Sequence, residues 1–345
     1  MTSDPPAVRY ELLSPETVEG LQECIRRTYG ETYPFRWLYD RVAVETRLRE
    51  GWLVDAIARA ADGRVVGTIG LLLASPHNAS GDYSADSLAA MVDPDFRGHD
   101  VMLGMGAELY RGFRPYGLAG IHLYALALHD VVQRKSTVSG DAQPTGVLPS
   151  YFDRDVRVAG FDTGGRRVGA VTLFQPVATI SPPRVMTLPT RYAEPLREIY
   201  ARLPLPRDGR LAHDVARDRS PLAERSACEL SVEPANREAR LRVRRTGADL
   251  ARRLDALIAR AEDECLSALY VDLALDDAAI DVGVGVANAV GFSFGALVPE
   301  RLHTDWLRLQ RYDPSEVSPS SMVVVGDAAR RLLALVEDDG RRSRG

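Results

Sequence analysis

Lysine and cysteine are scarce in this chain of 345 residues, and both shortages limit the classes of protein to which it can belong. Lys135 is the only lysine, so arginine carries almost all of the positive charge, and 43 basic against 48 acidic residues give a net charge of -5. An acidic balance gives the whole chain no attraction to nucleic acid. The three cysteines, Cys24, Cys228 and Cys265, are too few and too scattered for a disulfide framework and suit a reducing cytoplasm.

Long apolar runs and metal-ligand spacings are missing as well. No stretch of about 18 apolar residues occurs, so we expect no transmembrane helix. The N-terminus lacks the basic region and apolar run of a signal peptide. The six histidines form no HxxxH or Cys/His cluster, so we expect no metal. These absences predict a cytoplasmic protein that binds neither nucleic acid nor membrane.

Apolar periodicity and turn residues predict a mixed-sheet α/β architecture in two tandem domains, which suits a chain of this length. Over 8–178 the order is strand, helices, three strands, helix, strand, helix and two strands. The segment Ile180–Arg184 contains a double proline and indicates a linker, because proline can neither donate to a sheet nor continue a helix. We therefore predict domains at 1–180 and 181–345.

The second half repeats the order of elements of the first. A turn, helix and strand at 97–124 recur at 245–270, and the two strands contain the similar sequences Leu-Tyr-Ala-Leu-Ala-Leu and Leu-Tyr-Val-Asp-Leu-Ala-Leu. Each strand is followed by a predicted helix, a glycine (Gly140 or Gly291) and a β-hairpin. An internal duplication explains this recurrence. A further strand is predicted at Met322–Val325, before a last helix.

The segment Val92–Met102 lies between an apolar strand and an amphipathic helix and has the sequence Val-Asp-Pro-Asp-Phe-Arg-Gly-His-Asp-Val-Met. A turn that opens a helix offers backbone N–H groups and the positive end of the helix dipole to a phosphate. This segment resembles the donor-binding motif of the Gcn5-related N-acetyltransferase superfamily, V-x-P-x-[FY]-R-G-x-G-[IV]-[GA]. The order of elements over nearly all of 8–178 is similar too. The resemblance implies an acyltransferase whose co-substrate is acetyl-CoA or another acyl-CoA, with each domain a twisted mixed sheet flanked by helices.

The resemblance also assigns the donor-binding residues. They are Met91, Val92, Phe96, Arg97, Gly98, His99, Asp100, Val101 and Met102. In this superfamily the pantetheine arm pairs with the fourth strand, here 88–92, where a backbone N–H would polarise the thioester carbonyl.

Asp100 and Met102 depart from the pattern, which has glycine or alanine at these positions. A carboxylate at 4 Å repels a phosphate by about 1 kcal/mol even in water. Three possibilities stay open: the donor lies differently, its phosphates bind weakly, or an acyl carrier protein presents the phosphopantetheine.

The acceptor amine must lose a proton before it attacks, so we looked for a base and for an acid to protonate the leaving thiolate. The fourth strand holds no glutamate, and Asp86 at its start is the nearest carboxylate. His129, at the end of the fifth strand, is the other candidate base, or else a helix-capping residue. Tyr151 is the candidate acid, or else a packed strand tyrosine. Tyr124 completes the set of candidate catalytic residues.

The second half lacks a donor turn, since Arg244–Asp249 stands at the corresponding place without the proline, the aromatic residue or Arg-Gly. The nearby strand is strongly basic, with Arg240, Arg242, Arg244 and Arg245. Such a stripe is typical of a solvated face, with an acidic partner or substrate as the alternative. Gly283 and Gly285 lack GxGxxG spacing and are interpreted as helix positions. We interpret this half as a degenerate copy that shapes the acceptor pocket or a dimer interface.

The sequence therefore predicts acyl transfer from a thioester donor to an amine of a small molecule, by a monomer or a homodimer. Two alternatives stay open. One is a non-catalytic binding or scaffold protein, which Asp100 and the missing glutamate favour. The other is an aminoacyl-tRNA-dependent transferase, against which the acidic net charge argues.

Overall fold

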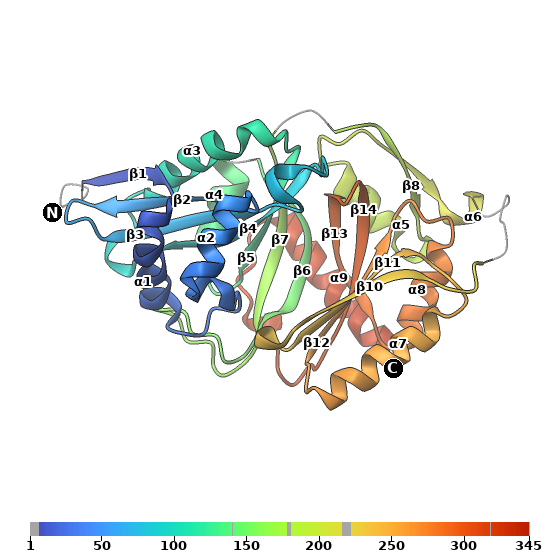
Figure 1. Cartoon of the computed structure of the whole chain (residues 1–345). Coiled ribbons are helices and arrows are strands. Elements are labelled where there is room, and N and C mark those ends of the chain that lie inside the picture. The colour runs from blue at the N-terminus through green and yellow to red at the C-terminus, as the bar shows by residue number, and fades with distance from the viewer. Residues whose placement is uncertain (1–6, 140, 178–180, 216–221, 318, 345) are drawn as a thin grey trace. The chain divides into compact units, whose positions relative to one another are not determined.

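The computed structural model describes residues 7–139, 141–177, 181–215, 222–317 and 319–344 (Figure 1). By their contacts these residues form two compact units: unit 1 comprises 1–123 and 155–165, and unit 2 comprises 124–154 and 166–345. Gly140 of the predicted repeat and Ile180 of the predicted linker lie outside the described residues. No helix among the described residues is long and apolar enough to span a membrane.

Unit 1 contains a mixed sheet in which β1 to β4 form an antiparallel meander and β4 pairs with β5 in parallel. Its strands are β1 (Val8–Leu12), β2 (Leu53–Ala60), β3 (Val65–Leu72), β4 (Ser84–Val92) and the start of β5 (Gly120–Leu126). Its helices are α1 (Val18–Tyr29), α2 (Arg41–Glu50) and α3 (Val101–Phe113). The sequence predicted each of these elements, because every strand is apolar and every helix begins at a turn.

Helices α1 and α3 lie on opposite sides of this sheet (Figure 1). Glycines bring α3 close to the strands: a Cβ at Gly104 would lie 2.2 Å from the ring of Tyr10, and one at Gly112 would lie 2.8 Å from Val54. Successive strand residues point to opposite faces, so Asp55, next to Val54, projects toward α1. Asp55 is therefore on the side away from α3.

Asp55 is a buried carboxyl group inside the unit 1 sheet, with 1% of its surface exposed. The Thr68 hydroxyl donates to its Oδ1 at 2.8 Å, and its Oδ2 has no hydrogen-bond partner among the described residues. Burial raises the pKa of Asp55 to about 7, although the Thr68 hydrogen bond opposes the shift. Nearby, burial also raises the pKa of the Cys24 thiol to about 12. Asp55 therefore keeps its proton at acidic pH, and the Cys24 thiol stays protonated at neutral pH as well.

Unit 2 contains a sheet with the strand order β7-β6-β13-β14-β12-β11-β10. Its strands are β6 (Gln143–Phe152), β7 (Val168–Pro176), β10 (Ala227–Glu233), β11 (Glu238–Arg245), β12 (Ala268–Ala274), β13 (Ser293–Arg301) and β14 (Thr304–Tyr312). Its helices are α4 (Val131–Ser139), α5 (Ala193–Tyr200), α6 (Ala212–Val215), α7 (Leu250–Asp263), α8 (Ile280–Ala289) and α9 (Asp327–Arg344). One face of the sheet packs against α5, α7, α8 and α9 to form a single apolar core.

The order of elements repeats along the chain, as the sequence predicted. The run β11–α7–β12–α8–β13–β14 follows the same order as β4–α3–β5–α4–β6–β7. In both runs the first two strands pair in parallel and the last two pair antiparallel. The predicted mixed α/β architecture is confirmed. The boundary at residue 180 stays a prediction about the two copies, because the compact units follow contacts and place β6 and β7 in unit 2.

Two sequence predictions about unit 2 were wrong. Met322–Val325 forms no strand and follows a short 3-10 turn at Pro319–Ser321. Arg184, assigned to the linker, begins β8 (Arg184–Leu188), which pairs in parallel with β9 (Arg207–Leu211). Neither β8 nor β9 has a strong local pattern.

Buried ion pairs hold β8 and β9 in place. Arg184 lies 2.9 Å from Glu300, and Arg207 lies 2.7 Å from Asp305, and both carboxylates are fully buried. These contacts join residues about 100 positions apart, which explains why the local sequence did not predict the strands.

The basic strand β11 is only in part the solvated face that its sequence suggested, since Arg244 is 42% exposed and Arg245 is exposed but the two preceding arginines are not. The side chains of Arg240 and Arg242 are only 26% and 24% exposed. Arg240 pairs with Glu238 at 2.7 Å and lies 4.0 Å from Asp272, and Arg242 pairs with Glu229 at 3.2 Å. The arginines therefore have carboxylate partners within the chain.

We predict that Asp55→Asn changes how stability depends on pH. The folded state holds the Asp55 proton up to about pH 7, and the unfolded chain releases it near its ordinary pKa of 3.8. Wild-type stability should therefore fall between about pH 4 and pH 7, by on the order of 4 kcal/mol at most, and this group adds nothing further above pH 7. The variant should lack this fall and gain on wild type as the pH rises.

Urea unfolding at pH 5 and pH 8 measures the effect. The exposed turn residue Asp62 provides the control variant, Asp62→Asn, which should follow wild type at both values. A difference between Asp55→Asn and wild type that is the same at both pH values would contradict a buried, protonated Asp55.

Candidate functional site

The candidate site is built around the turn between β4 and α3 in unit 1. A short 3-10 turn at Pro94–Phe96 follows β4, and α3 begins at Val101. Gly98 has φ +88° and Asp100 has φ +54°, and both values lie in the left-handed region that favours glycine. Asp is one of the few other residues that tolerate this conformation. The resembled motif has glycine at the position of Asp100, and the left-handed backbone conformation at this position explains that preference.

Asp93 fixes this turn to the rest of unit 1. Its carboxylate is buried and accepts hydrogen bonds from Arg27 Nε of α1 at 2.6 Å and from the backbone N–H of Asp95 at 3.2 Å. Its own backbone N–H donates to the Val66 carbonyl of β3 at 2.8 Å. Arg27 also donates to the Val65 carbonyl. One buried carboxylate therefore connects the turn with α1 and β3.

Arg97 is exposed at the turn, but its side chain is already engaged. Its Nε donates to the Val92 carbonyl at 3.2 Å and its Nη1 to the Ala159 carbonyl at 3.0 Å. The guanidinium also lies 5.8 Å from the centre of the Phe161 ring. Arg97 therefore joins the turn to loop 156–163 of unit 1.

The other predicted donor residues follow the end of β4 and the start of α3. Met91 and Val101 are buried, and Val92, Phe96, His99 and Met102 are half-buried. Arg64 lies over the Phe96 ring at 5.5 Å. All nine predicted donor residues lie in unit 1, in one continuous segment.

Strand β4 has an edge that no strand of unit 1 covers. It pairs with β5 only over Ser84–Asp86, opposite 120–122, although β4 continues to Val92. The β4–β3 pairing shifts register near Ala89, which has φ +50°. Within the described residues of unit 1, the edge at 87–92 that faces away from β3 is therefore open to an extended ligand.

Tyr33 supports the irregular part of β4. Its hydroxyl accepts the Ala89 N–H at 2.9 Å, and its ring packs against Tyr29 and Phe35 at centroid distances of 4.7 and 5.6 Å. Burial raises the pKa of both tyrosines well above the ordinary value. Tyr33 therefore stays neutral and holds the backbone of the register shift.

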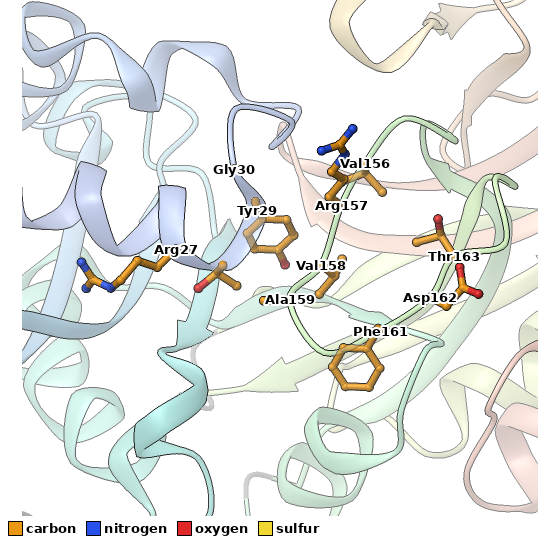
Figure 2. Close-up of a pocket in the computed structure, with 11 residues that line it drawn as sticks. Arg27, Tyr29, Gly30, Val156, Arg157, Val158, Ala159, Phe161, Asp162 and Thr163 are labelled. Carbon is orange, nitrogen blue, oxygen red and sulfur yellow. The ribbon is translucent and has the colours of Figure 1, made fainter.

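A hollow of about 390 Å³ lies beside the turn, between the end of α1 and loop 156–163 (Figure 2). Its residues are Arg27, Thr28, Tyr29, Gly30, Val156, Arg157, Val158, Ala159, Phe161, Asp162 and Thr163. The loop is fixed to α1 by the Ala159 N–H, which donates to the Thr28 carbonyl at 2.8 Å. Figure 2 shows the Arg27 guanidinium directed away from the loop, with Asp162 and Thr163 together at the other end.

The candidate catalytic residues are divided between the units. Asp86 is half-buried on β4 in unit 1, opposite Leu72 and His122. Tyr124 and Tyr151 stack in unit 2, with ring centroids 4.9 Å apart and planes at 7°. His129, also in unit 2, lies three residues beyond the end of β5 and is half-buried. Their catalytic roles stay predictions.

Sequence reasoning missed Arg27 and Tyr33, which support the turn and β4 from elsewhere in the chain, and the buried Asp55, which bonds to Thr68 of β3. Asp55 had a signal, since it is the one charged residue in the apolar stretch Leu-Val-Asp-Ala-Ile. Nothing in the sequence distinguished Arg27, because arginines are common in the last turn of a helix and Arg26 stands next to it.

The corresponding turn of the second half is closed by its own side chains. The Thr246 N–H donates to Asp277 Oδ2 at 2.7 Å, and the Gly247 N–H donates to Ser226 Oγ at 3.0 Å. The Ala248 N–H donates to the Ala223 carbonyl at 2.8 Å. These N–H groups are unavailable to a phosphate, which agrees with the prediction of a degenerate copy.

We predict that Arg27→Ala destabilises unit 1 by about 2–3 kcal/mol, because it leaves the buried Asp93 carboxylate without its closest cation. Chemical unfolding measures this change. Arg26→Ala is the matched control, since Arg26 pairs with Glu31 on the surface, and it should cost less than about 1 kcal/mol. Equal effects of the two substitutions would show that Asp93 does not depend on Arg27.

No protein-family model and no curated protein matches the chain. It is similar in structure to nourseothricin acetyltransferase, with 15% identity and a TM-score of 0.29 over 37% of this chain and 66% of that one. It is similar to Ard1 of Thermoplasma volcanium, with 19% identity and a TM-score of 0.36 over 50% and 99%. It is also similar to the PaiA N-acetyltransferase of Thermoplasma acidophilum in complex with coenzyme A, with 16% identity and a TM-score of 0.33 over 50% and 99%. Each of these likenesses covers half of this chain or less.

Proposed function

We propose that this chain is an N-acyltransferase that moves an acyl group from an acyl-CoA to an amine of a small molecule. The observation that carries the proposal is the open edge of β4, which runs into an anchored turn at the N-terminus of α3. An extended thioester arm needs such an edge, and its phosphates need such a turn. The proposal extends the sequence resemblance to the Gcn5-related N-acetyltransferases.

The donor would lie along β4 with its phosphates at the turn. The first N–H groups of α3, at Val101 and Met102, have no partner within the helix, so an anion bound at the turn would accept hydrogen bonds from them. The peptide edge at 87–92 would pair with the amides of the pantetheine arm. The Ala89 N–H is taken by Tyr33, so polarisation of the thioester carbonyl falls to another N–H of this edge.

The hollow beside the turn is the candidate acceptor site. Asp162 and Arg157 are exposed in its wall and have opposite charges, so an amine could bind near Asp162. In the reaction the amine nitrogen bonds to the thioester carbon and the C–S bond breaks. The amine loses a proton to a base, and the thiolate gains one. Asp86 is the candidate base within unit 1.

A second function, binding of a ligand without turnover, has two observations in its favour. Two donors of Arg97 are used by backbone carbonyls, which leaves less of the side chain for donor phosphates. Asp100 also places a negative charge at the start of α3. Assays of acyl transfer from acetyl-CoA to a panel of amines separate the two functions, because a binding protein releases no free thiol.

We predict that Arg97→Ala weakens CoA binding by about 1–3 kcal/mol, the range for hydrogen bonds to a charged group. Part of the loss would come from loop 156–163, which Arg97 holds through Ala159. Titration calorimetry measures the dissociation constant. Arg114→Ala, at the far end of α3, is the control and should bind as wild type does. An unchanged constant for Arg97→Ala would move the donor phosphates elsewhere.

We predict that Asp100→Gly binds CoA as tightly as wild type or more tightly. The substitution removes a negative charge near the phosphates, and it places glycine where φ is +54°. Asp95→Asn is the control, since it removes a charge from the same turn at a residue with ordinary φ. A tighter complex with Asp100→Gly alone would show that backbone conformation contributes as well as charge.

Steady-state kinetics with free acyl-CoA and with an acylated carrier protein test which of the two is the natural donor. If an acyl carrier protein is the natural donor, free acyl-CoA should be a poor substrate for wild type and for Asp100→Gly alike. Loss of activity with every donor in Asp100→Gly would show that Asp100 is needed for catalysis or folding, and our account of the turn would be wrong.

A further inference from the structure

A second hollow, of about 710 Å³, lies in unit 2 beside α8 and the end of α9. Its wall contains Thr190, Arg191, Asp281, Val284, Gly285, Asn288, Ala289, Arg342 and Ser343. The hollow shares no residue with the candidate donor or acceptor site. We propose that it binds a small anion, a carboxylate or a phosphate, that also carries a hydrogen-bond donor such as a hydroxyl group.

The wall holds an arginine that is fixed before any ligand arrives. Asp339 is fully buried and accepts hydrogen bonds from Arg191 Nη2 at 2.6 Å, from Tyr192 Oη at 2.7 Å and from the Phe294 N–H at 2.8 Å. Arg191 Nε also donates to Asp339, at 3.1 Å. An arginine oriented in this way loses little conformational freedom when it binds an anion.

Arg342 supplies a positive charge that the chain does not fully use. Its guanidinium lies 3.7 Å from Asp339, beyond hydrogen-bond distance, and its side chain is 66% exposed. The acid in the wall, Asp281, already accepts hydrogen bonds from the backbone N–H and the hydroxyl of Thr190, at 2.7 and 2.9 Å. The wall therefore offers the exposed guanidinium of Arg342 to an anion, while its acid, Asp281, is already hydrogen-bonded to Thr190.

Asn288 offers a neutral acceptor in the same wall. It is 9% exposed, and its Nδ2 donates to Tyr192 Oη at 2.7 Å and to the Phe292 carbonyl at 2.8 Å. Both amide hydrogens are thus used, which fixes the orientation of the side chain. Within the described part of the chain its Oδ1 accepts no hydrogen bond and is not sealed from solvent. A hydroxyl group next to the anion would satisfy this oxygen.

Helix α8 contains two glycines, and close packing explains only one of them. A Cβ at Gly283 would lie 2.9 Å from Thr246 Oγ1, so close packing explains this glycine. A Cβ at Gly285 would meet nothing within 4 Å, and Gly285 is exposed in the wall of the hollow. Glycine inside a helix costs about 1 kcal/mol relative to alanine. Packing gives no reason to keep Gly285, whereas space for a ligand does.

Calorimetric titration of the full chain with inorganic phosphate and with citrate, at constant ionic strength, tests the proposal. Wild type should bind at least one of them, and the comparison decides between phosphate and carboxylate chemistry. Arg342→Gln should weaken binding at least tenfold. Arg341→Gln is the matched control, because Arg341 is also 66% exposed and pairs with Asp338, and it should bind within twofold of wild type.

Gly285→Leu separates binding from folding. Leucine should leave the melting temperature unchanged or raise it, because the helix gains propensity and a Cβ at this position would meet no atom within 4 Å. It should nevertheless weaken binding at least tenfold, because it fills the hollow. Three results would overturn the proposal: no binding of either anion by wild type, equal weakening by Arg341→Gln and Arg342→Gln, or wild-type affinity in Gly285→Leu.

Discussion

The ion pair between Arg27 and Asp93 is the contact on which the candidate site depends. Removing a carboxylate from water is costly, and Asp93 can be buried because Arg27 and the backbone N–H of Asp95 donate hydrogen bonds to its carboxylate. The same arginine donates to β3. It therefore fixes the positions of α1, the sheet and the turn relative to one another. Gly98 and Asp100 can then keep left-handed backbone conformations at the start of α3.

Asp100 combines two effects that the sequence alone could not separate. The resembled pattern has glycine at this position, so the carboxylate of Asp100 first suggests repulsion of a phosphate. The φ of +54° adds a conformational effect, because aspartate is strained where glycine is not. In the proposed donor complex the charge would oppose phosphate binding, whereas the strained backbone lowers the stability of the turn. A natural donor that relies little on this turn, such as a carrier-bound arm, would tolerate both.

Local signals predicted the parts of the site that are local. The strand, the turn and α3 follow each other in sequence, so apolar periodicity and the Asp-Pro and Arg-Gly pairs located them together. The supporting contacts join distant residues: Arg27 meets Asp93 across 66 positions, and Arg97 meets Ala159 across 62. No spacing rule predicts such pairs. The strands β8 and β9 were missed for the same reason, because buried pairs with Glu300 and Asp305 hold them.

The two halves differ in what occupies the turn before their long helix. In the second half the Asp277 carboxylate, 5% exposed, accepts the Thr246 N–H at the place where a donor phosphate would bind. It acts as an internal anion, so that the turn is satisfied without a ligand. In the first half the carboxylate of the turn, Asp93, points instead to Arg27. The two carboxylates are not counterparts, because Asp93 belongs to the turn itself and Asp277 follows β12. A duplicated fold therefore keeps its sheet and helices in both copies, while the turn before the long helix makes different contacts in each.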